Sequence, residues 1–446
     1  MDRSYRYYDV RRVKGELSQI DIDNSVIESA GSSFVDLALI RVLGPVGWGV
    51  LSVNGDLIEG DSLPDTLLHE ALDAAKITNG AVSIVEGECQ VLSVPKPKED
   101  PRDVSLEEKT QILLDLERHA KMDDIVNTRV TYTERTGNIT FFDSSDNRFS
   151  YEICRCGFGI LAVACKDGIT QMGYERRHTI NGLNIRHQQN LALHAGTIAQ
   201  ELLHAKPARG GMMNAVLDPE LAGVFAHEAI GHAAEGDLVQ EGSSVLAGRI
   251  GEKVGTPVLT IIDDPTIEDF GFCPVDDEGS KTKRTEIIKS GVVNAYLHSM
   301  ESMAAVGEDT GVLGHARGMA GIVPIVRMSN TFIDNGDSDY DEIINECNDG
   351  ILLKGSRGGQ VDPGRGVFQF NAEYGYLIEN GECTTMVRDV SLSGDILGTL
   401  HQVQLCGNDR KLHAGYCGKY GQTAPVSDGA PHILLKNAVV GGSCLD

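Results

Sequence analysis

Residues 218–237 constrain the fold of this chain most strongly, because they place ionisable side chains on a helix whose flanks are apolar. Asp218 and Pro219 are typical of a helix start, where a carboxylate caps free amide groups and proline fits the first turn. Apolar residues then recur at helical spacing from Leu221 to Phe225, so one face of the helix is expected in a core.

Two imidazoles and a carboxylate follow on the same helix, in the pattern HExxxH at His227, Glu228 and His232. In a regular α-helix, residues five positions apart lie about 140° apart around the axis, so the two imidazoles could not share one metal ion. A π-bulge, or an opening of the helix at Gly231, would bring them together, and such bulges often occur at functional sites. We therefore predict an irregular turn between Glu228 and His232.

The HExxxH pattern has two interpretations. In the simpler one, the histidines bond locally and Glu228 faces solvent. However, the flanking residues carry no charge, which indicates a buried helix, and burying these three groups without partners costs several kcal/mol each. A metal ion removes that cost, so a metal site is favoured.

A catalytic zinc site needs three protein ligands and one open position, so a third ligand must come from outside the helix. Spacing alone does not choose among the downstream candidates, which are several carboxylates and Cys273, Cys383, Cys406, Cys417, His298, His315 and His413. Cys417 is slightly favoured, because the glycines at 415 and 418 predict a turn that would expose a thiolate.

Charge and apolar patterning exclude several classes of protein. The formal net charge of −26 argues against binding to a nucleic-acid backbone or an anionic membrane surface. No apolar run approaches the ~20 residues of a membrane span, and the first residues contain no apolar signal core. The ten cysteines are scattered, which favours reduced thiols. We expect a soluble cytoplasmic protein.

Two boundaries divide the chain into three expected domains. Residues 95–101 contain three prolines and predict a stiff linker, and residues 207–211 mark the second boundary. We expect α+β domains at 1–95 and 102–206, and a β-rich domain at 212–446 that carries the helix. The predicted fold class is therefore α+β, with antiparallel strands and helices preceding a mostly β C-terminal domain.

Local patterns predict the elements of the first two domains. Alternating apolar residues across 17–53 predict an antiparallel meander, and residues 80–91 predict another strand. A Gly-Asn pair at 137–138 predicts a turn between two strands. An Asp-Gly pair at 167–168 predicts a tight β-hairpin.

An ordered set of motifs extends over nearly the whole chain. It comprises the block 227–237 and the downstream blocks 261–265, 276–279, 283–285, 314–317, 327–331, 359–362, 376–381, 407–409, 417–425 and 440–442. This set resembles the TldD/PmbA family of metallopeptidases, in its TldD-like branch that bears HExxxH. The N-terminal third matches in pattern more than in residues.

The resemblance implies a zinc peptidase whose ligands are His227, His232 and Cys417, with Glu228 as the general base. It also implies an unfolded peptide substrate, bound in extended form beside a sheet edge. A dimer is expected, either with a TldE/PmbA-like subunit that lacks the metal motif or with a second copy of this chain.

Several residues near these motifs keep two interpretations. Glu235 and Asp237 either orient the imidazoles or cap the helix end and face water. His413 either competes for the metal or lies at the surface, and Cys444 is interpreted as a free tail thiol. Peptide-carboxylate binding or a purely structural role remains open for three arginines, Arg284, Arg317 and Arg327.

Two other functional classes remain open. A non-catalytic regulator of the gyrase-modulator type would leave the HExxxH residues unexplained, and the acidity of the chain disfavours direct contact with DNA. A thiol hydrolase would use Cys417 as the nucleophile and His413 as its base. Such an enzyme should survive a chelator and fail after alkylation.

Overall fold

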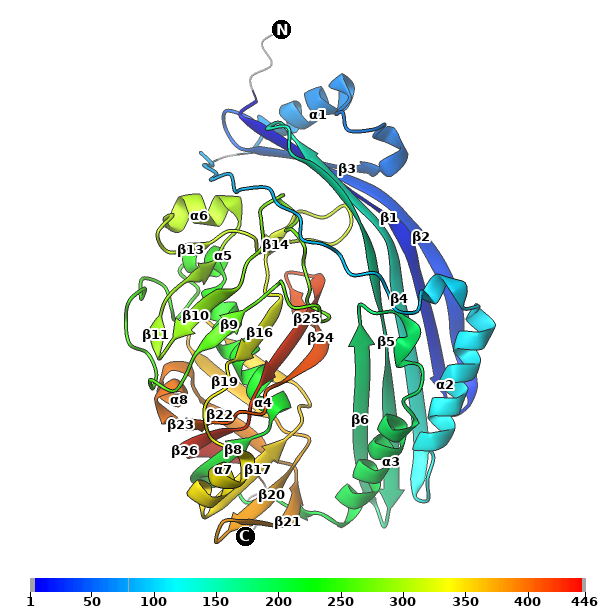
Figure 1. Ribbon diagram of the computed structural model, residues 1–446, viewed down its shortest axis with the longest axis vertical. Coiled ribbons are helices and arrows are strands. Elements are labelled where there is room, and N and C mark those ends of the chain that lie inside the picture. Colours follow the sequence, from blue (N-terminus) through cyan, green and yellow to red (C-terminus); the bar gives the residue numbers. More distant parts are fainter. Residues whose placement is uncertain (1–4, 79, 443–446) are drawn as a thin grey trace.

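The N-terminal unit, residues 5–204, is built on one long curved sheet of six antiparallel strands (Figure 1). The computed structural model describes residues 5–78 and 80–442. The strands are β1 (Tyr7–Asp23), β2 (Val26–Leu43), β3 (Trp48–Asn54), β4 (Ile125–Asp143), β5 (Arg148–Lys166) and β6 (Ile169–Thr179). Their order is β3-β2-β1-β4-β5-β6, so the predicted meander and the predicted β5–β6 hairpin are confirmed.

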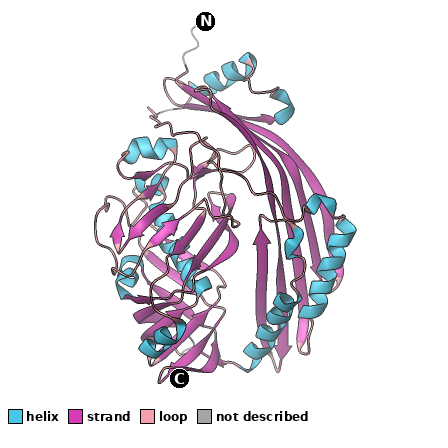
Figure 2. Ribbon diagram, in the orientation of Figure 1, coloured by secondary structure: helices cyan, strands magenta, loops and turns pink. Residues whose placement is uncertain are grey.

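Three helices pack on this sheet. Helix α1 (Asp65–Ala75) covers β2 and β3, α2 (Leu106–Ala120) packs on β4 and β5, and α3 (Gln189–His204) packs on β5 and on the edge strand β6. Ser105 caps the start of α2, because its side chain accepts a hydrogen bond from the backbone N–H of Glu108. Figure 2 shows α2 and α3 on the outer side of the sheet, with the C-terminal unit facing its other side.

The first two predicted domains contribute to this same sheet. Strand β1 pairs with β4 along its length, from Asp9 opposite Asp143 to Asp23 opposite Arg129. The division of this region at residues 95–102 stays a prediction, and a cut there would separate strands that share their hydrogen bonds.

Two local predictions in this unit are wrong. The expected turn at 137–138 lies inside the continuous strand β4, where Gly137 faces Gly15 of β1. A Cβ atom on Gly137 would lie 2.3 Å from the carbonyl oxygen of Lys14, so this glycine serves close strand approach rather than a turn. Residues 80–91 form no strand. They run extended along the C-terminal unit, where the N–H of Val85 donates to the carbonyl oxygen of Met300 at 3.0 Å.

The C-terminal unit, residues 206–442, contains a ten-stranded sheet with the path β18-β19-β22-β26-β8-β17-β20-β21-β7, and β23 also pairs with β26. Its strands are β7 (Lys206–Pro207), β8 (Gly211–Leu217), β17 (Gly350–Lys354), β18 (Gly359–Asp362), β19 (Val367–Asn371), β20 (Tyr374–Glu379), β21 (Glu382–Arg388), β22 (Ser391–Asp395), β23 (Val403–Cys406) and β26 (Ile433–Gly441).

A second sheet of this unit has the order β11-β10-β9-β16-β25-β24. Its strands are β9 (Ile261–Asp263), β10 (Thr285–Lys289), β11 (Val292–Val293), β16 (Asn330–Ile333), β24 (Lys411–Lys419) and β25 (Gln422–Ala430). Two strand pairs complete the unit, β12 (Tyr296–Leu297) with β13 (Gly311–Val312) and β14 (Ala316–Arg317) with β15 (Ile325–Val326). The remaining helices are α5 (Gly236–Gln240), α6 (Met300–Val306), α7 (Tyr340–Cys347) and α8 (Ile396–Gln402).

Helix α4 (Pro219–Phe225) lies between these two sheets. It contacts β8 and β17 of the larger sheet and β16, β24 and β25 of the smaller one. Its apolar residues Leu221 and Phe225 are fully buried in the largest core of the molecule. The predicted α+β fold class, with a mostly β C-terminal part that carries the helix, is confirmed.

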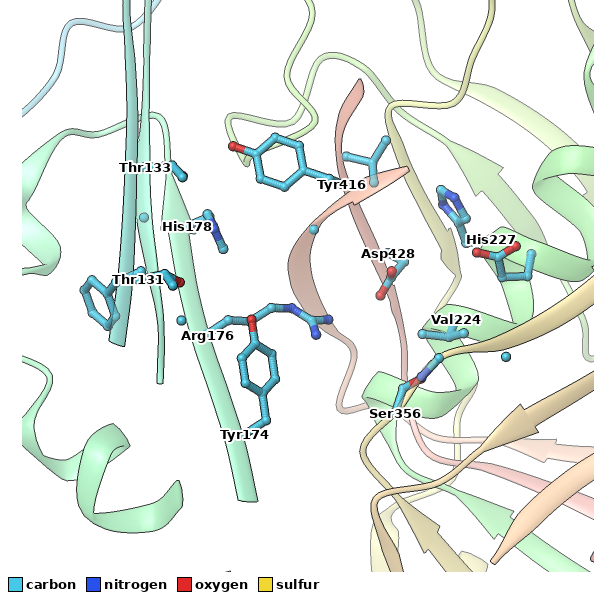
Figure 3. A pocket seen from close by; sticks show the side chains of 18 residues that line it. Thr131, Thr133, Tyr174, Arg176, His178, Val224, His227, Ser356, Tyr416 and Asp428 are labelled. Carbon is cyan, nitrogen blue, oxygen red and sulfur yellow. The ribbon is translucent and has the colours of Figure 1, made fainter. Parts of the chain in front are cut away.

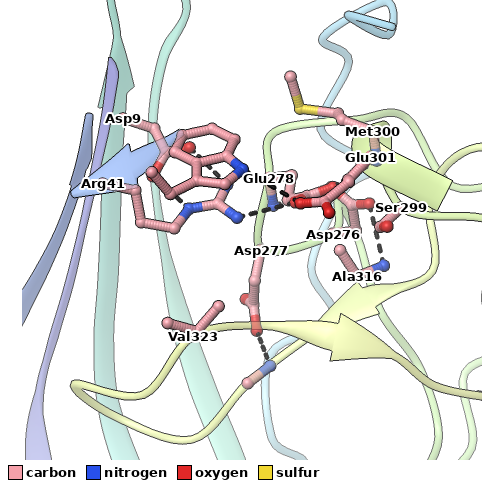
Figure 4. Close-up of polar contacts among 12 residues, drawn as sticks. Asp9, Arg41, Asp276, Asp277, Glu278, Ser299, Met300, Glu301, Ala316 and Val323 are labelled. Atoms are coloured by element: carbon pink, nitrogen blue, oxygen red, sulfur yellow. Dashed lines mark hydrogen bonds and ion pairs between the residues drawn. The ribbon is translucent and has the colours of Figure 1, made fainter. Parts of the chain in front are cut away.

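A buried ion network joins the two units (Figure 4). The Arg41 guanidinium on β2 binds Asp9 of β1 at 2.5 Å and Glu278 of the C-terminal unit at 2.8 Å. Glu278 also accepts a hydrogen bond from the N–H of Met300 at the start of α6.

Within the described ranges, none of the helices is both long enough and apolar enough to cross a lipid bilayer.

Candidate metal centre

The helix that carries the HExxxH residues changes its winding at the motif. Asp218 caps α4 by accepting a hydrogen bond from the N–H of Leu221 at 2.9 Å. Residues Ala226–Gly231 then form a π-helical turn, and a short 3₁₀ turn, His232–Ala234, follows. The predicted irregular turn is therefore confirmed, and it is of the π type.

The π turn places the two imidazoles side by side. The rings of His227 and His232 have centroids 5.3 Å apart and lie nearly perpendicular to one another. Gly231 permits this path, because a Cβ atom there would lie 1.9 Å from the Sδ atom of the buried Met328. Both imidazoles are buried.

Cys417 reaches the imidazoles from strand β24. Its Sγ atom lies 3.3 Å from Nε2 of His232. Among the described residues, His227, His232 and Cys417 form the one group of three potential ligands, with ligand atoms within 4.8 Å of one another. The expectation of an exposing turn around Cys417 is wrong, because the residue is buried in a strand and pairs with Ala424 of β25.

Charge complementarity binds the three side chains together. Burial alone would raise the pKa of the Cys417 thiol, but the charges and hydrogen bonds of His227 and His232 lower it to about 4. Burial lowers the pKa of His227, yet the Cys417 thiolate raises it overall to about 9. A thiolate therefore lies against two imidazoles that attract it.

These residues fit a divalent transition metal. The Nδ1 atom of His227 is buried and has no hydrogen-bond partner among the described residues, although a buried ring nitrogen normally has one. Two imidazoles and one thiolate form a three-ligand set of the kind that leaves a coordination position open.

Two acidic residues near the ligands have different contacts. Glu235 is fully buried, and its Oε2 atom lies 2.9 Å from Nδ1 of His232. Both carboxylates bind the ammonium group of Lys419, Glu235 at 3.0 Å and Asp237 at 2.7 Å, but Asp237 contacts no imidazole. Of the two open interpretations, orientation of an imidazole therefore fits Glu235, while Asp237 fixes a lysine.

Glu228 lines a cavity of about 450 Å³, here called the metal cleft, together with His227. The Glu228 carboxylate is half-buried and lies 3.8 Å from Nε2 of His232. Figure 3 shows Tyr174, Arg176 and His178 of β6 on the opposite side of the cleft from His227.

Sequence reasoning missed this β6 wall, because nothing in the local pattern of residues 169–179 indicates that they approach the helix. Arg176 holds β6 close to β24 and α4. Its Nε donates a hydrogen bond to the carbonyl oxygen of Ala414 on β24 at 2.8 Å, and its guanidinium binds Glu220 on α4 at 3.1 Å.

The other candidate ligands lie elsewhere. His413 is half-buried on β24, opposite Asp428, and lies outside the three-residue group. The His298 ring bonds to Ser302 and Thr310, and Cys383 is exposed. Cys444 lies outside the described residues.

Comparison with known proteins decides the family. The model described as "PmbA/TldA metallopeptidase C-terminal domain" matches residues 210–442, and the corresponding central-domain model matches residues 99–204. The chain belongs to this family. It is a metallopeptidase of the TldD/PmbA type, as its motifs predicted.

Individual relatives agree with this assignment. A protein of Archaeoglobus fulgidus named "Metalloprotease" is 40% identical over 439 residues, which cover 98% of this chain and 100% of the relative. A "Zinc metalloprotease TldD homolog" of Saccharolobus solfataricus is 29% identical over 325 residues, covering 70% of this chain and 71% of the relative.

The fold itself also occurs in a solved structure. The crystal structure of TldE from Thermococcus kodakarensis has a TM-score of 0.78 and 19% sequence identity, and the match covers 98% of this chain and 97% of TldE. At this level of identity, the likeness concerns the fold alone.

Proposed function

We propose that this chain is a zinc-dependent peptidase for unfolded or extended peptides. In this proposal His227, His232 and Cys417 hold the metal, and Glu228 is the general base. The main support is that the π turn brings His227 and His232 together and strand β24 adds the sulfur of Cys417, so that the three ligand atoms lie within 4.8 Å of one another.

The residue types suit peptide hydrolysis. When bound, a zinc ion with two neutral imidazoles and one thiolate keeps a formal charge of +1 and would supply a Lewis acid at the peptide carbonyl. Glu228 is half-buried on the wall of the metal cleft, next to a proposed ligand. Its carboxylate can take a proton from the attacking water and pass it to the leaving amine.

Zinc is favoured over other ions by the donor set, since zinc accepts mixed imidazole and thiolate ligands in tetrahedral geometry. The relative from Saccharolobus solfataricus supports the same metal, because its name includes zinc.

An extended peptide fits the edges that border the cleft. Strand β24 pairs only with β25, and β6 only with β5, in the sheets the structure describes, so each presents one free edge. Backbone groups at a free edge can bind a peptide in extended form with little dependence on side chains. A dimer with a TldE-like subunit, or with a second copy, is proposed because a TldE structure shares this fold.

The decisive experiment compares wild type with Glu228→Gln on an unfolded peptide, with zinc content measured by elemental analysis. We expect about one zinc per chain in both proteins and a loss of kcat of roughly 10²–10⁴-fold in the variant. The assay includes a TldE-like subunit in one arm. Full activity of a zinc-loaded Glu228→Gln protein would show that the base is wrong.

Chelation and alkylation separate the remaining alternatives. A zinc enzyme should lose activity with a chelator and recover it with zinc, whereas a thiol hydrolase would resist chelation. The Cys417 thiolate contacts His227 and His232 rather than His413, which disfavours the thiol-hydrolase alternative. Absence of stoichiometric metal would favour a non-catalytic regulator.

A further inference from the structure

A second cavity, of about 330 Å³, lies between the inner face of the long sheet and the C-terminal unit. Five arginines line it, and we call it the arginine cavity: Arg11, Arg135, Arg155, Arg317 and Arg327. The acidic residues of the lining are Glu16 and Asp277. This is a local excess of positive charge in a chain with a formal net charge of −26.

Little of this positive charge is balanced by carboxylates. Arg11 pairs with Asp277 at 2.8 Å. Three of the other guanidinium groups donate to neutral backbone carbonyl oxygens: Arg155 to those of Phe270 and Phe272, Arg317 to those of Met328 and Pro425, and Arg327 to those of Gln422 and Cys417. The guanidinium of Arg135, an exposed residue that lines the mouth of this cavity, has neither a hydrogen bond nor an ion pair to any residue the structure describes.

The arginines also crowd one another. Arg135 of β4 and Arg155 of β5 are direct cross-strand partners, an arrangement in which like charges are unfavourable. Burial, and then the positive charge of Arg317, lower the pKa of Arg155. The Nε atom of Arg327, a residue only 1% exposed, is buried without a hydrogen-bond partner in the described part of the chain. An anion would relieve all three features.

Apolar side chains also line the cavity. Val13 and Leu17 of β1, Leu37 of β2, and Ile139 and Ile153 of β4 and β5 contribute to the walls. A ligand matched to this cavity therefore carries an anionic group on an apolar body, rather than being a bare inorganic ion.

The arginine cavity continues the metal cleft along shared strands. On β4, Thr133 lines the metal cleft and Arg135, on the same face, lines the arginine cavity. Residues two apart on a strand are about 7 Å apart. On β25, Val426 lines the first cavity and its neighbour Pro425 the second. An extended chain of a few residues would span both.

We propose that the arginine cavity binds the C-terminal carboxylate and the last apolar side chain of a peptide whose scissile bond, a few residues earlier in the peptide, lies in the metal cleft. This inference rests on the proposed peptidase function and specifies its substrate class. The cleavage products should then include a short C-terminal fragment of constant length.

Direct binding tests the site without any catalysis. In calorimetry at low chloride, N-acetylleucine should bind wild type saturably, and N-acetylleucinamide, which lacks the carboxylate, should bind at least tenfold more weakly. Arg135→Gln should weaken binding of the acid at least tenfold, and Arg135→Lys should restore much of it. Arg284→Gln removes an exposed arginine outside the cavity and should change nothing. Equal binding of acid and amide, or no effect of Arg135→Gln, would overturn the proposal.

Peptide cleavage provides the second readout. A hexapeptide with a free C-terminus should have a KM at least tenfold lower than its amidated form, with kcat unchanged, and Arg135→Gln should abolish the difference. Mass spectrometry should find one C-terminal fragment length. If the enzyme cleaves the free-acid and amidated hexapeptides with equal KM, the carboxylate site is overturned but the peptidase function is not. If the protein binds N-acetylleucine but cleaves neither peptide, the peptidase function is overturned but the carboxylate site is not.

Discussion

Gly231 shows how the lack of a side chain permits the π turn at Ala226–Gly231. Its Cα lies against Met328, which is fully buried and cannot move into solvent. A regular α-helix at this position would separate the two imidazoles around the axis. The π turn and the packing of Met328 are therefore linked through this glycine.

Replacing Gly231 by alanine should destabilise the protein by about 1–3 kcal/mol, because the new methyl group overlaps Met328 in a packed core. Urea unfolding measures the loss, and zinc content should fall in parallel if the π turn relaxes. Gly31→Ala is the matched control, since a Cβ atom there meets nothing within 4 Å. Equal stability of the two variants would contradict the packing argument.

Glu235→Gln should lower metal affinity roughly 10–100-fold, because the carboxylate that faces Nδ1 of His232 is neutralised. Competition with a chromophoric chelator measures the affinity. Asp237→Asn serves as the control, since Asp237 contacts Lys419 and no imidazole. Similar losses in both variants would indicate a general effect of acidic charge rather than orientation of the ring.

At this scale, sequence reasoning identified the helix start at Asp218 and the irregular turn before His232, because both depend on nearby residues. Spacing did not choose the third ligand, and the reason for slightly favouring Cys417, an exposing turn between its flanking glycines, is wrong. The contact between Cys417 and His232 spans 185 positions, and local patterns contain no information about such distances.

At the scale of elements, helix α2 is fixed to the long sheet by a buried ion pair. Lys109 of α2 binds Glu134 of β4 at 2.6 Å, and both side chains are nearly inaccessible to solvent. The hydroxyl of Tyr132 donates to the same carboxylate. Among the described ion pairs, Lys109 binds no other carboxylate and Glu134 binds no other cation. The pair therefore fixes the position of α2 on the sheet.

Lys109→Met should destabilise the protein by about 3–5 kcal/mol, because it leaves Glu134 buried without its cation. Adding Glu134→Gln in the same chain should recover most of the loss, since the amide can still accept from Tyr132. Denaturant unfolding of both variants tests this, and a single variant as stable as wild type would contradict it.

Elements with strong local signals were predicted well, including the β5–β6 hairpin. The failure at Gly137 has a different origin. A glycine beside asparagine favours a turn locally, but its actual role is set by Gly15 on the neighbouring strand, more than a hundred positions earlier. The β6 wall of the metal cleft was missed for the same physical reason.

For the whole molecule, the two units share buried charge rather than only apolar contact. Arg41 is held by Asp9 within the N-terminal unit and by Glu278 across the junction. Trp48, the single tryptophan of the chain, lies against Arg41 and donates to Glu301 of the C-terminal unit. Its fluorescence therefore reports on this junction.

Arg41→Met should cost about 3–5 kcal/mol, because two buried carboxylates lose their shared cation. We expect Trp48 fluorescence to change at lower urea concentration than circular dichroism in the variant, and the two to coincide in wild type. Arg148→Met removes an exposed ion pair and should leave both signals unchanged. Coincident, unshifted transitions in Arg41→Met would show that the junction does not depend on this arginine.

The long separation between the motif helix and Cys417 has a consequence for biosynthesis. While a ribosome is still translating residues before 417, the nascent chain already contains both imidazoles but not the sulfur that lies against them. Strand β25 must also emerge before β24 has its pairing neighbour. Under the proposed ligand set, the metal site would therefore be completed only late in synthesis.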